Sequence, residues 1–139
     1  MKYPLYFFIS TLFIFTSCHS TKNMGGTSEK VIVFGNGGGF TGQVTEFVLD
    51  EKGTFMKNDK LTSEVTILPS LKKAETKKLF KDLETMHFDT INFKHPGNTY
   101  YFIRSNNSNA SHEVVWGEAD NLPPTAILQF YDALLSKTK

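Results

Sequence analysis

Residues 31–49 read VIVFGNGGGFTGQVTEFVL, in which two β-forming runs flank a segment rich in glycine. Val31–Phe34 is a short run of β-branched and aromatic residues, and Gln43–Leu49 is a second one. Gly35–Gly42 interrupts them and predicts a bulge or a tight corner between two strands. Because glycine lets a backbone approach a partner closely, the same segment could instead be a recognition loop. Phe40 would then be an exposed anchor, whereas in a purely structural corner it would plug the core.

The residues that follow predict further strands. Asp50–Gly53 is typical of a hairpin turn with Gly53 in the left-handed conformation, after which residues 54–56 would return as a strand. Residues 58–59, Asn-Asp, mark another turn, and Leu61–Leu68 alternates weakly between apolar and polar side chains.

Two helices are predicted from apolar periodicity. Ser70 is a plausible N-cap of the first, in which Leu79, Leu83 and Met86 recur at i, i+4 and i+7 with Phe80 beside them. The second follows the prolines at 123–124, because proline is tolerated in the first turn of a helix. Its apolar face consists of Ile127, Phe130, Tyr131 and Leu134.

A second hairpin is expected between the helices. Tyr100–Arg104 and His112–Trp116 are β-rich runs, and the residues from Asn106 to Ser111 that join them are rich in turn formers. The order of strands, helix, strands, helix indicates an α+β fold: a small antiparallel sheet with two helices packed on one face. We expect a single domain of this kind over residues 30–139.

The segment Gly37–Gly42 matches the pattern G-x-G-x-x-G of dinucleotide-binding proteins. That fingerprint requires a helix directly after it, so that the N-terminus of the helix meets the pyrophosphate. The run from Gln43 to Leu49 is typical of a strand instead, and the P-loop lysine is missing. We therefore expect no nucleotide to bind here.

Catalytic and metal motifs are also missing from the sequence. His112-Glu113 resembles the start of the zinc-protease motif H-E-x-x-H, but Trp116 stands where the second histidine belongs. His87 and His95 lack metal-ligand spacing, and no G-x-S-x-G elbow is present. We expect no metal, no cofactor and no enzymatic activity.

The N-terminus carries an export signal. Lys2 begins it, and residues 3–16 form an apolar run that is shorter than the roughly 20 residues of a membrane-spanning helix but fits a signal peptide. Cys18, the only cysteine, follows Phe15-Thr16-Ser17. This arrangement resembles a bacterial lipoprotein signal, which implies removal of residues 1–17 and acylation of Cys18, for example with palmitate. An ordinary secretory signal or an N-terminal anchor with an incidental cysteine is the alternative.

Residues 18–29 are small and polar and are expected to form a flexible tether. No acidic residue stands just after Cys18, and in particular no aspartate directly follows it. By resemblance to other lipoproteins, this pattern implies anchoring in the outer membrane, with the domain in the periplasm.

The charge balance excludes one class of partner. Of the 15 lysine and arginine residues only Lys2 lies in the signal, so the remaining ones equal the 14 acidic residues in number. Nucleic-acid binders usually carry a strong basic excess or patch, so we expect no nucleic acid as a partner.

The run Gly38-Gly39-Phe40-Thr41-Gly42 resembles the GGFAG motif of emfourin-like proteins, a bacterial family of metalloprotease inhibitors. The layout is also similar, because in both a strand leads into this motif and is followed by a helix, a hairpin and a C-terminal helix. Thr41 stands where the family has alanine, and the hairpin at residues 50–70 is an addition. The resemblance implies the fold and, for function, an inhibitor-like protein-binding domain.

Together these patterns predict a lipid-anchored cell-envelope protein whose domain binds a protein partner without catalysis. The candidate binding residues are Gly38, Gly39, Phe40, Thr41 and Trp116. Trp116 stands at the end of a β-rich run, where the alternatives to binding are a place in the core or at the lip of a small pocket. The alternatives are a structural or assembly lipoprotein of the envelope, and an enzyme whose site has no recognisable motif.

Overall fold

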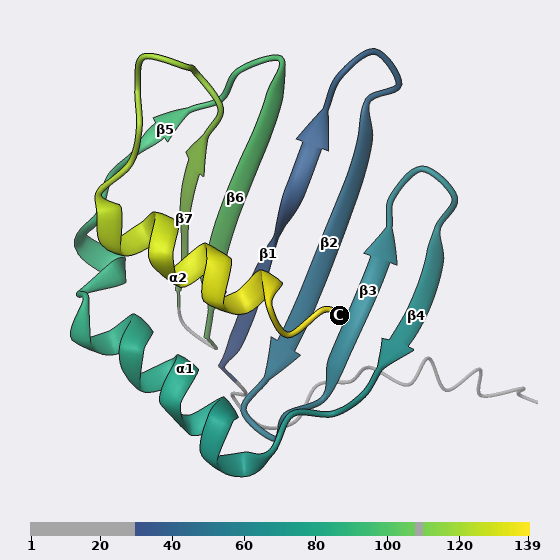
Figure 1. The fold of residues 1–139 in the computed structure, drawn as a ribbon, viewed down its shortest axis with the longest axis vertical. Helices are drawn as coiled ribbons and strands as arrows, with labels where there is room; N and C mark the ends of the chain where they lie inside the picture. Colours follow the sequence, from purple (N-terminus) through teal and green to yellow (C-terminus); the bar gives the residue numbers. More distant parts are fainter. Residues whose placement is uncertain (1–29, 108–109) are drawn as a thin grey trace, which may run out of the picture.

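The computed structural model describes residues 30–107 and 110–139, which form one seven-stranded sheet with two α-helices (Figure 1). The strand order is β4-β3-β2-β1-β6-β7-β5, and every pair is antiparallel except β5–β7. The strands are β1 Val31–Gly38, β2 Gln43–Asp50, β3 Phe55–Asp59, β4 Glu64–Leu68, β5 Lys94–His95, β6 Thr99–Asn106 and β7 Ser111–Trp116. The helices are α1 Lys73–Thr85, the 3₁₀ turn η1 Phe88–Thr90 and α2 Thr125–Leu135. The predicted α+β class is confirmed.

The central strand β1 pairs with β2 and β6 along its whole length. It continues through Gly38, so the prediction that Gly35 ends the strand is wrong. A close approach explains the glycine at position 37. A Cβ there would lie 2.7 Å from the ring of Tyr100 on β6, because that ring covers the backbone of β1. Glycine weakens a strand on its own, but here it makes room for an aromatic side chain from the neighbouring strand.

One face of the sheet carries the core. Both helices pack there, and in Figure 1 α2 crosses β7, β6 and β1. The predicted face of α2 is buried completely, as are Leu79, Phe80 and Leu83 of α1, whereas Met86 is only partly buried. These side chains meet the alternate residues of the strands, among them Ile32, Phe34, Phe47, Leu49, Phe55, Ile103, Val114 and Trp116. The helical periodicity seen in the sequence therefore identified the buried faces.

Two predicted boundaries differ in the structure. Ser70 does not cap α1, because residues 69–72 belong to neither a helix nor a strand and the helix begins after Lys72, whose backbone is extended. The backbone N–H of Leu71 donates to the carbonyl of Gly53. Residues 58–59 continue β3 rather than forming a turn. The turn comes afterwards, where the carboxylate of Asp59 accepts the backbone N–H groups of Leu61 and Thr62. The left-handed turn at Gly53 is confirmed, with φ at 93°.

None of the helices in the described residues packs on the other face of the sheet. Val33, Phe102 and Val115 form a small second cluster there, with Val44, Val48 and Tyr100 packed around it. We call this side the open face. Within residues 30–107 and 110–139, no helix has the length and apolar character that crossing a membrane requires.

Candidate functional site

The tip of the β1–β2 hairpin displays Phe40. Its side chain is 106% exposed, so Phe40 is a surface residue and the interpretation as a core plug is wrong. Gly38 and Gly39 precede it with φ angles of 94° and 75°, and Gly42 follows with 62°. These values lie in the left-handed region that glycine adopts without steric cost. The sequence of this tip is therefore suited to a tight turn that projects an aromatic ring into solvent.

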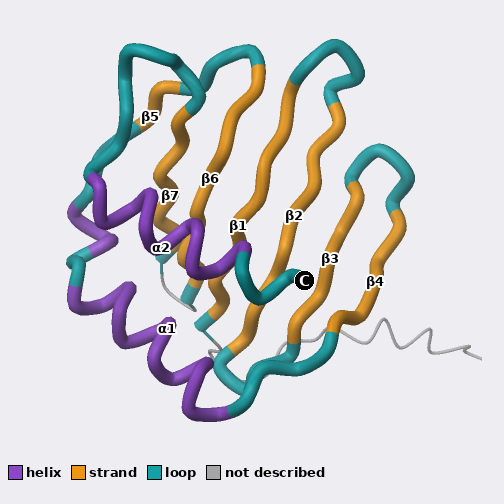
Figure 2. The backbone as a smooth tube through the Cα atoms, in the orientation of Figure 1, coloured by secondary structure: helices purple, strands orange, loops and turns teal. Residues whose placement is uncertain are grey.

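The base of this tip is fixed against a neighbouring loop. The backbone N–H of Gly39 donates to the carbonyl of Asn98 at 2.8 Å, and a Cβ on Gly38 would lie 2.1 Å from the same carbonyl oxygen. Figure 2 shows the two loops at the same end of the sheet, above β1 and β6. Thr41 lies on the exposed side of the turn, where its hydroxyl accepts the N–H of Gln43 at 3.4 Å. The turn thus presents Phe40 from a backbone held by hydrogen bonds.

Trp116, the other aromatic candidate, lies in the core. It is 5% exposed, and its ring centroid is 5.1 Å from that of Tyr131 and 5.9 Å from that of Tyr101. The structure therefore does not bring Trp116 together with Phe40 on one surface. The sequence could not distinguish these cases, because the burial of Trp116 depends on contacts with residues distant in the chain, among them Tyr131 of α2.

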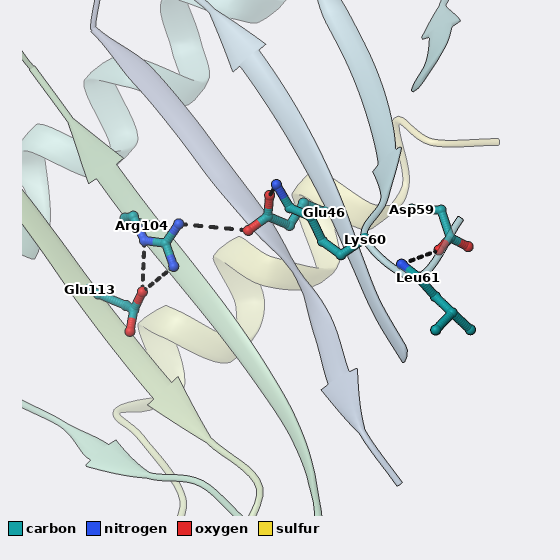
Figure 3. A network of polar contacts seen from close by, with 6 residues as sticks. All are labelled: Glu46, Asp59, Lys60, Leu61, Arg104 and Glu113. Carbon is teal, nitrogen blue, oxygen red and sulfur yellow. Dashed lines mark hydrogen bonds and ion pairs between the residues drawn. The ribbon is translucent and has the colours of Figure 1, made fainter. Parts of the chain in front are cut away.

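A row of charged side chains crosses the open face (Figure 3). The guanidinium of Arg104 on β6 donates to Glu113 on β7 from Nε at 2.7 Å and lies 3.7 Å from Glu46 on β2. Glu46 also pairs with the ammonium group of Lys60 at 2.7 Å. Sequence reasoning missed this row, because its members come from separate strands. The alternation of side chains along each strand is the signal that could have found it, because it places Glu46, Arg104 and Glu113 on the face opposite the core residues of their strands.

Beside this row lies a hollow of about 430 Å³. Its walls combine the apolar cluster of the open face with the charged row, and they comprise Val44, Glu46, Lys94, Pro96, Tyr100, Phe102, Arg104, Glu113 and Val115. The two carboxylates that approach Arg104 are held by cations rather than by one another. They therefore do not form the carboxylate pair that general acid–base catalysis uses.

Two of the candidate histidines, His112 and His95, contact neighbouring groups of the fold. Nε2 of His112 lies 2.9 Å from the carbonyl oxygen of Ile91, and its ring packs edge-on against Phe88. His95 lies near Glu118, with Nδ1 3.4 Å from the carboxylate. Across the two described segments, no three His, Cys, Asp or Glu side chains are grouped as a metal ion would require.

The glycine pattern at residues 37–42 is followed by a strand, as the sequence predicted. Gln43 begins strand β2 and not a helix, so no helix N-terminus faces the turn. The predicted signal peptide at residues 1–17, Cys18 and the predicted tether at residues 18–29 lie outside the described residues. A scan against protein-family models finds no match for this chain, and a search of curated proteins finds none either.

Proposed function

We propose that this chain is a lipid-anchored cell-envelope protein whose domain binds another protein without catalysing a reaction. The observation that carries the binding role is the fully exposed ring of Phe40 on a turn whose base is fixed. Aromatic side chains that fill a pocket on a partner contribute strongly to binding. Burial of a phenylalanine side chain is worth about 1.5–3 kcal/mol. Because the turn is already ordered, little conformational entropy would be lost on binding.

The membrane location in this proposal rests on the lipoprotein-like signal that ends at Cys18. An acyl chain on this cysteine would hold the domain at the surface of the outer membrane, on the periplasmic side. Mass spectrometry of the membrane fraction tests it directly. A mature chain that starts at Cys18 and carries added acyl mass supports the anchor, and a chain that retains Met1 contradicts it.

The most specific form of the binding proposal is inhibition of a metalloprotease. The resemblance of residues 38–42 to the emfourin-like motif suggests it, and the hairpin tip has a shape that can enter a cleft. The full chain in detergent should then slow peptide hydrolysis by a zinc metalloprotease from the same envelope. If such proteases cleave at the same rate with and without the chain, the inhibitor form is wrong.

The test of the binding surface compares Phe40→Ala with Leu122→Ala. Both side chains are exposed apolar groups, but Leu122 lies in the loop before α2, far along the chain from the hairpin. Partners are captured by the full chain from detergent-solubilised membranes and identified by mass spectrometry, and each variant is then assayed for binding. Phe40→Ala should weaken binding about tenfold or more, as expected for an anchor residue, and leave the melting temperature unchanged. Leu122→Ala should do neither.

Two results would contradict the role of Phe40. One is that both variants bind as the parent does, and the other is that Phe40→Ala lowers the melting temperature by many degrees. The captured protein also separates the alternatives. A protease supports inhibition, whereas a transport or assembly complex supports a scaffolding role.

A further inference from the structure

Strand β4 is the outermost strand at one end of the sheet, and none of the described residues pairs with its outer edge (Figure 1). It has five residues, and Val65 and Ile67 are 59% and 77% exposed. Natural proteins usually protect such an edge with proline, lysine or a bulge. Strand β4 has no proline, no lysine and an unbroken register with β3. As far as the described residues are concerned, its outer edge is therefore open to another strand.

The hydrogen bonds of the neighbouring strands show which backbone groups point outward. Lys60 donates to the carbonyl of Val44 at 2.9 Å, and Asp50 donates to the carbonyl of Thr54 at 3.1 Å. Because hydrogen-bonded residues alternate along an antiparallel strand, the even-numbered residues of β3 bond to β2 and the odd-numbered ones to β4. With Lys57 opposite Thr66, the residues of β4 that bond to β3 are then 64, 66 and 68. The N–H and C=O groups of Val65 and Ile67 point away from the sheet.

This edge is complementary to itself. If a second copy of β4 lies antiparallel to the first with its Thr66 opposite Thr66, each Val65 stands opposite the Ile67 of the other copy. Both residues have outward N–H and C=O groups, so the two pairs would exchange four hydrogen bonds. Their side chains lie on the same face and would form two apolar cross-strand contacts.

Charge does not oppose this arrangement. The only charged residue of β4 is Glu64, and it would lie opposite the apolar Leu68 of the second copy. The two Glu64 residues would be four positions apart, or about 13 Å along the strands. That separation exceeds the screening length of about 8 Å at physiological salt.

We propose that β4 pairs with β4 of a second copy of this chain, with a two-fold axis at Thr66, so that two domains share one continuous sheet. A five-residue edge buries less than the roughly 1,200 Å² of a stable interface, so the pairing needs a high local concentration. Molecules held on one bilayer surface meet that condition. This step rests on the lipid anchor proposed above.

Disulfide trapping of the full chain in membranes tests the pairing. In the proposed register the two Thr66 Cα atoms are about 4.5 Å apart, within the range of about 4.4–6.8 Å that a disulfide spans. On oxidation with copper phenanthroline and dissolved oxygen, Thr66→Cys should therefore give a product of twice the monomer mass. Glu64→Cys is the matched control, because it lies on the same strand and face but about 13 Å from its symmetry mate. The parent chain controls for Cys18, whose sulfur would be blocked by the lipid.

A second variant checks that the trapped dimer depends on the edge. Ile67→Lys in the Thr66→Cys background places a charge in the apolar pair and should reduce the dimer at least tenfold. Since Ile67 is mostly exposed, the melting temperature should stay the same. Equal trapping at positions 64 and 66, no trapping at 66, or no effect of Ile67→Lys would each overturn the pairing. A trapped product of another mass would mean that the edge takes a strand from a different protein, which also overturns it.

Fractionation separates failure of the pairing from failure of the anchor. If the chain stays in the membrane but is not trapped at position 66, only the pairing proposal is contradicted. If the chain is found in the soluble fraction and is trapped at position 66, only the anchor proposal is contradicted. If the chain is soluble and not trapped, both proposals are wrong.

Discussion

Tyr131 ties the last helix to the central strand through one buried hydroxyl group. The side chain is 6% exposed, and its hydroxyl donates to the backbone carbonyl of Gly35 at 3.0 Å. Its ring also packs edge-on against Phe34 and Trp116. The helical periodicity of α2 predicted that Tyr131 faces inward, but the identity of the acceptor depends on a strand 96 residues away in the chain. A side chain that joins such distant residues should matter for stability.

Tyr131→Phe should lower the free energy of unfolding by about 0.5–1.5 kcal/mol, because it removes one buried hydrogen bond. Urea denaturation followed by circular dichroism measures the change. Tyr100→Phe is the control, since the hydroxyl of Tyr100 has no hydrogen bond within the described residues, and it should be near neutral. Equal effects of the two variants would show that the bond to Gly35 contributes nothing.

The glycines of β1 allow its close pairing with the two neighbouring strands. On the open face, Gly37 lies beneath the ring of Tyr100 and next to Val44. From sequence, glycine suggested the end of a strand, because it has low strand propensity and often marks a turn. In the sheet, the contact with an aromatic residue on β6 reverses that inference. The contact is between residues 63 positions apart, and no local pattern reports it.

Gly37→Ala should lower the free energy of unfolding by about 1–3 kcal/mol, because its Cβ would overlap the Tyr100 ring. In a Tyr100→Ala background, the same substitution should cost at least about 1 kcal/mol less, since only the contact with Cγ2 of Val44 at 2.9 Å then remains. A double-mutant cycle by urea denaturation measures this coupling. If Gly37→Ala costs the same in both backgrounds, the ring is not what requires glycine.

The sheet has a covered face and an open face, and the most buried titratable side chain of the described residues, Tyr131, lies on the covered one. Burial raises the pKa of the Tyr131 phenol well above its ordinary value. In the folded chain the phenol therefore stays neutral at a pH where it ionises in the unfolded chain. The folded state then binds more protons, so stability falls as the pH rises.

The free energy of unfolding should be constant up to about pH 9 and should fall above about pH 10, where an exposed tyrosine begins to ionise. Denaturant midpoints measured across this range give the slope. The ion pair with Glu84 raises the pKa of Lys30, which acts in the same direction, but this pair is exposed and screened. The contribution of Tyr131 is therefore the part of the decrease in the free energy of unfolding above about pH 10 that is absent in Tyr131→Phe. An unchanged slope in that variant would assign the loss to other groups.

The amino-acid sequence sufficed to predict the α+β class, the two helices and their buried faces. These features follow from the repeat of apolar residues within a few positions, and Leu79, Leu83, Ile127 and Phe130 all lie inward as that repeat requires. Pairing and exposure depended on the tertiary structure. Phe40 is exposed because it stands on the turn beyond the end of β1, whereas Trp116 is buried because it lies in β7 on the face that packs against Tyr131 of α2. Local periodicity carries no information about which remote strand is the neighbour, so the charged row on the open face and the free edge of β4 could be identified only in the folded chain.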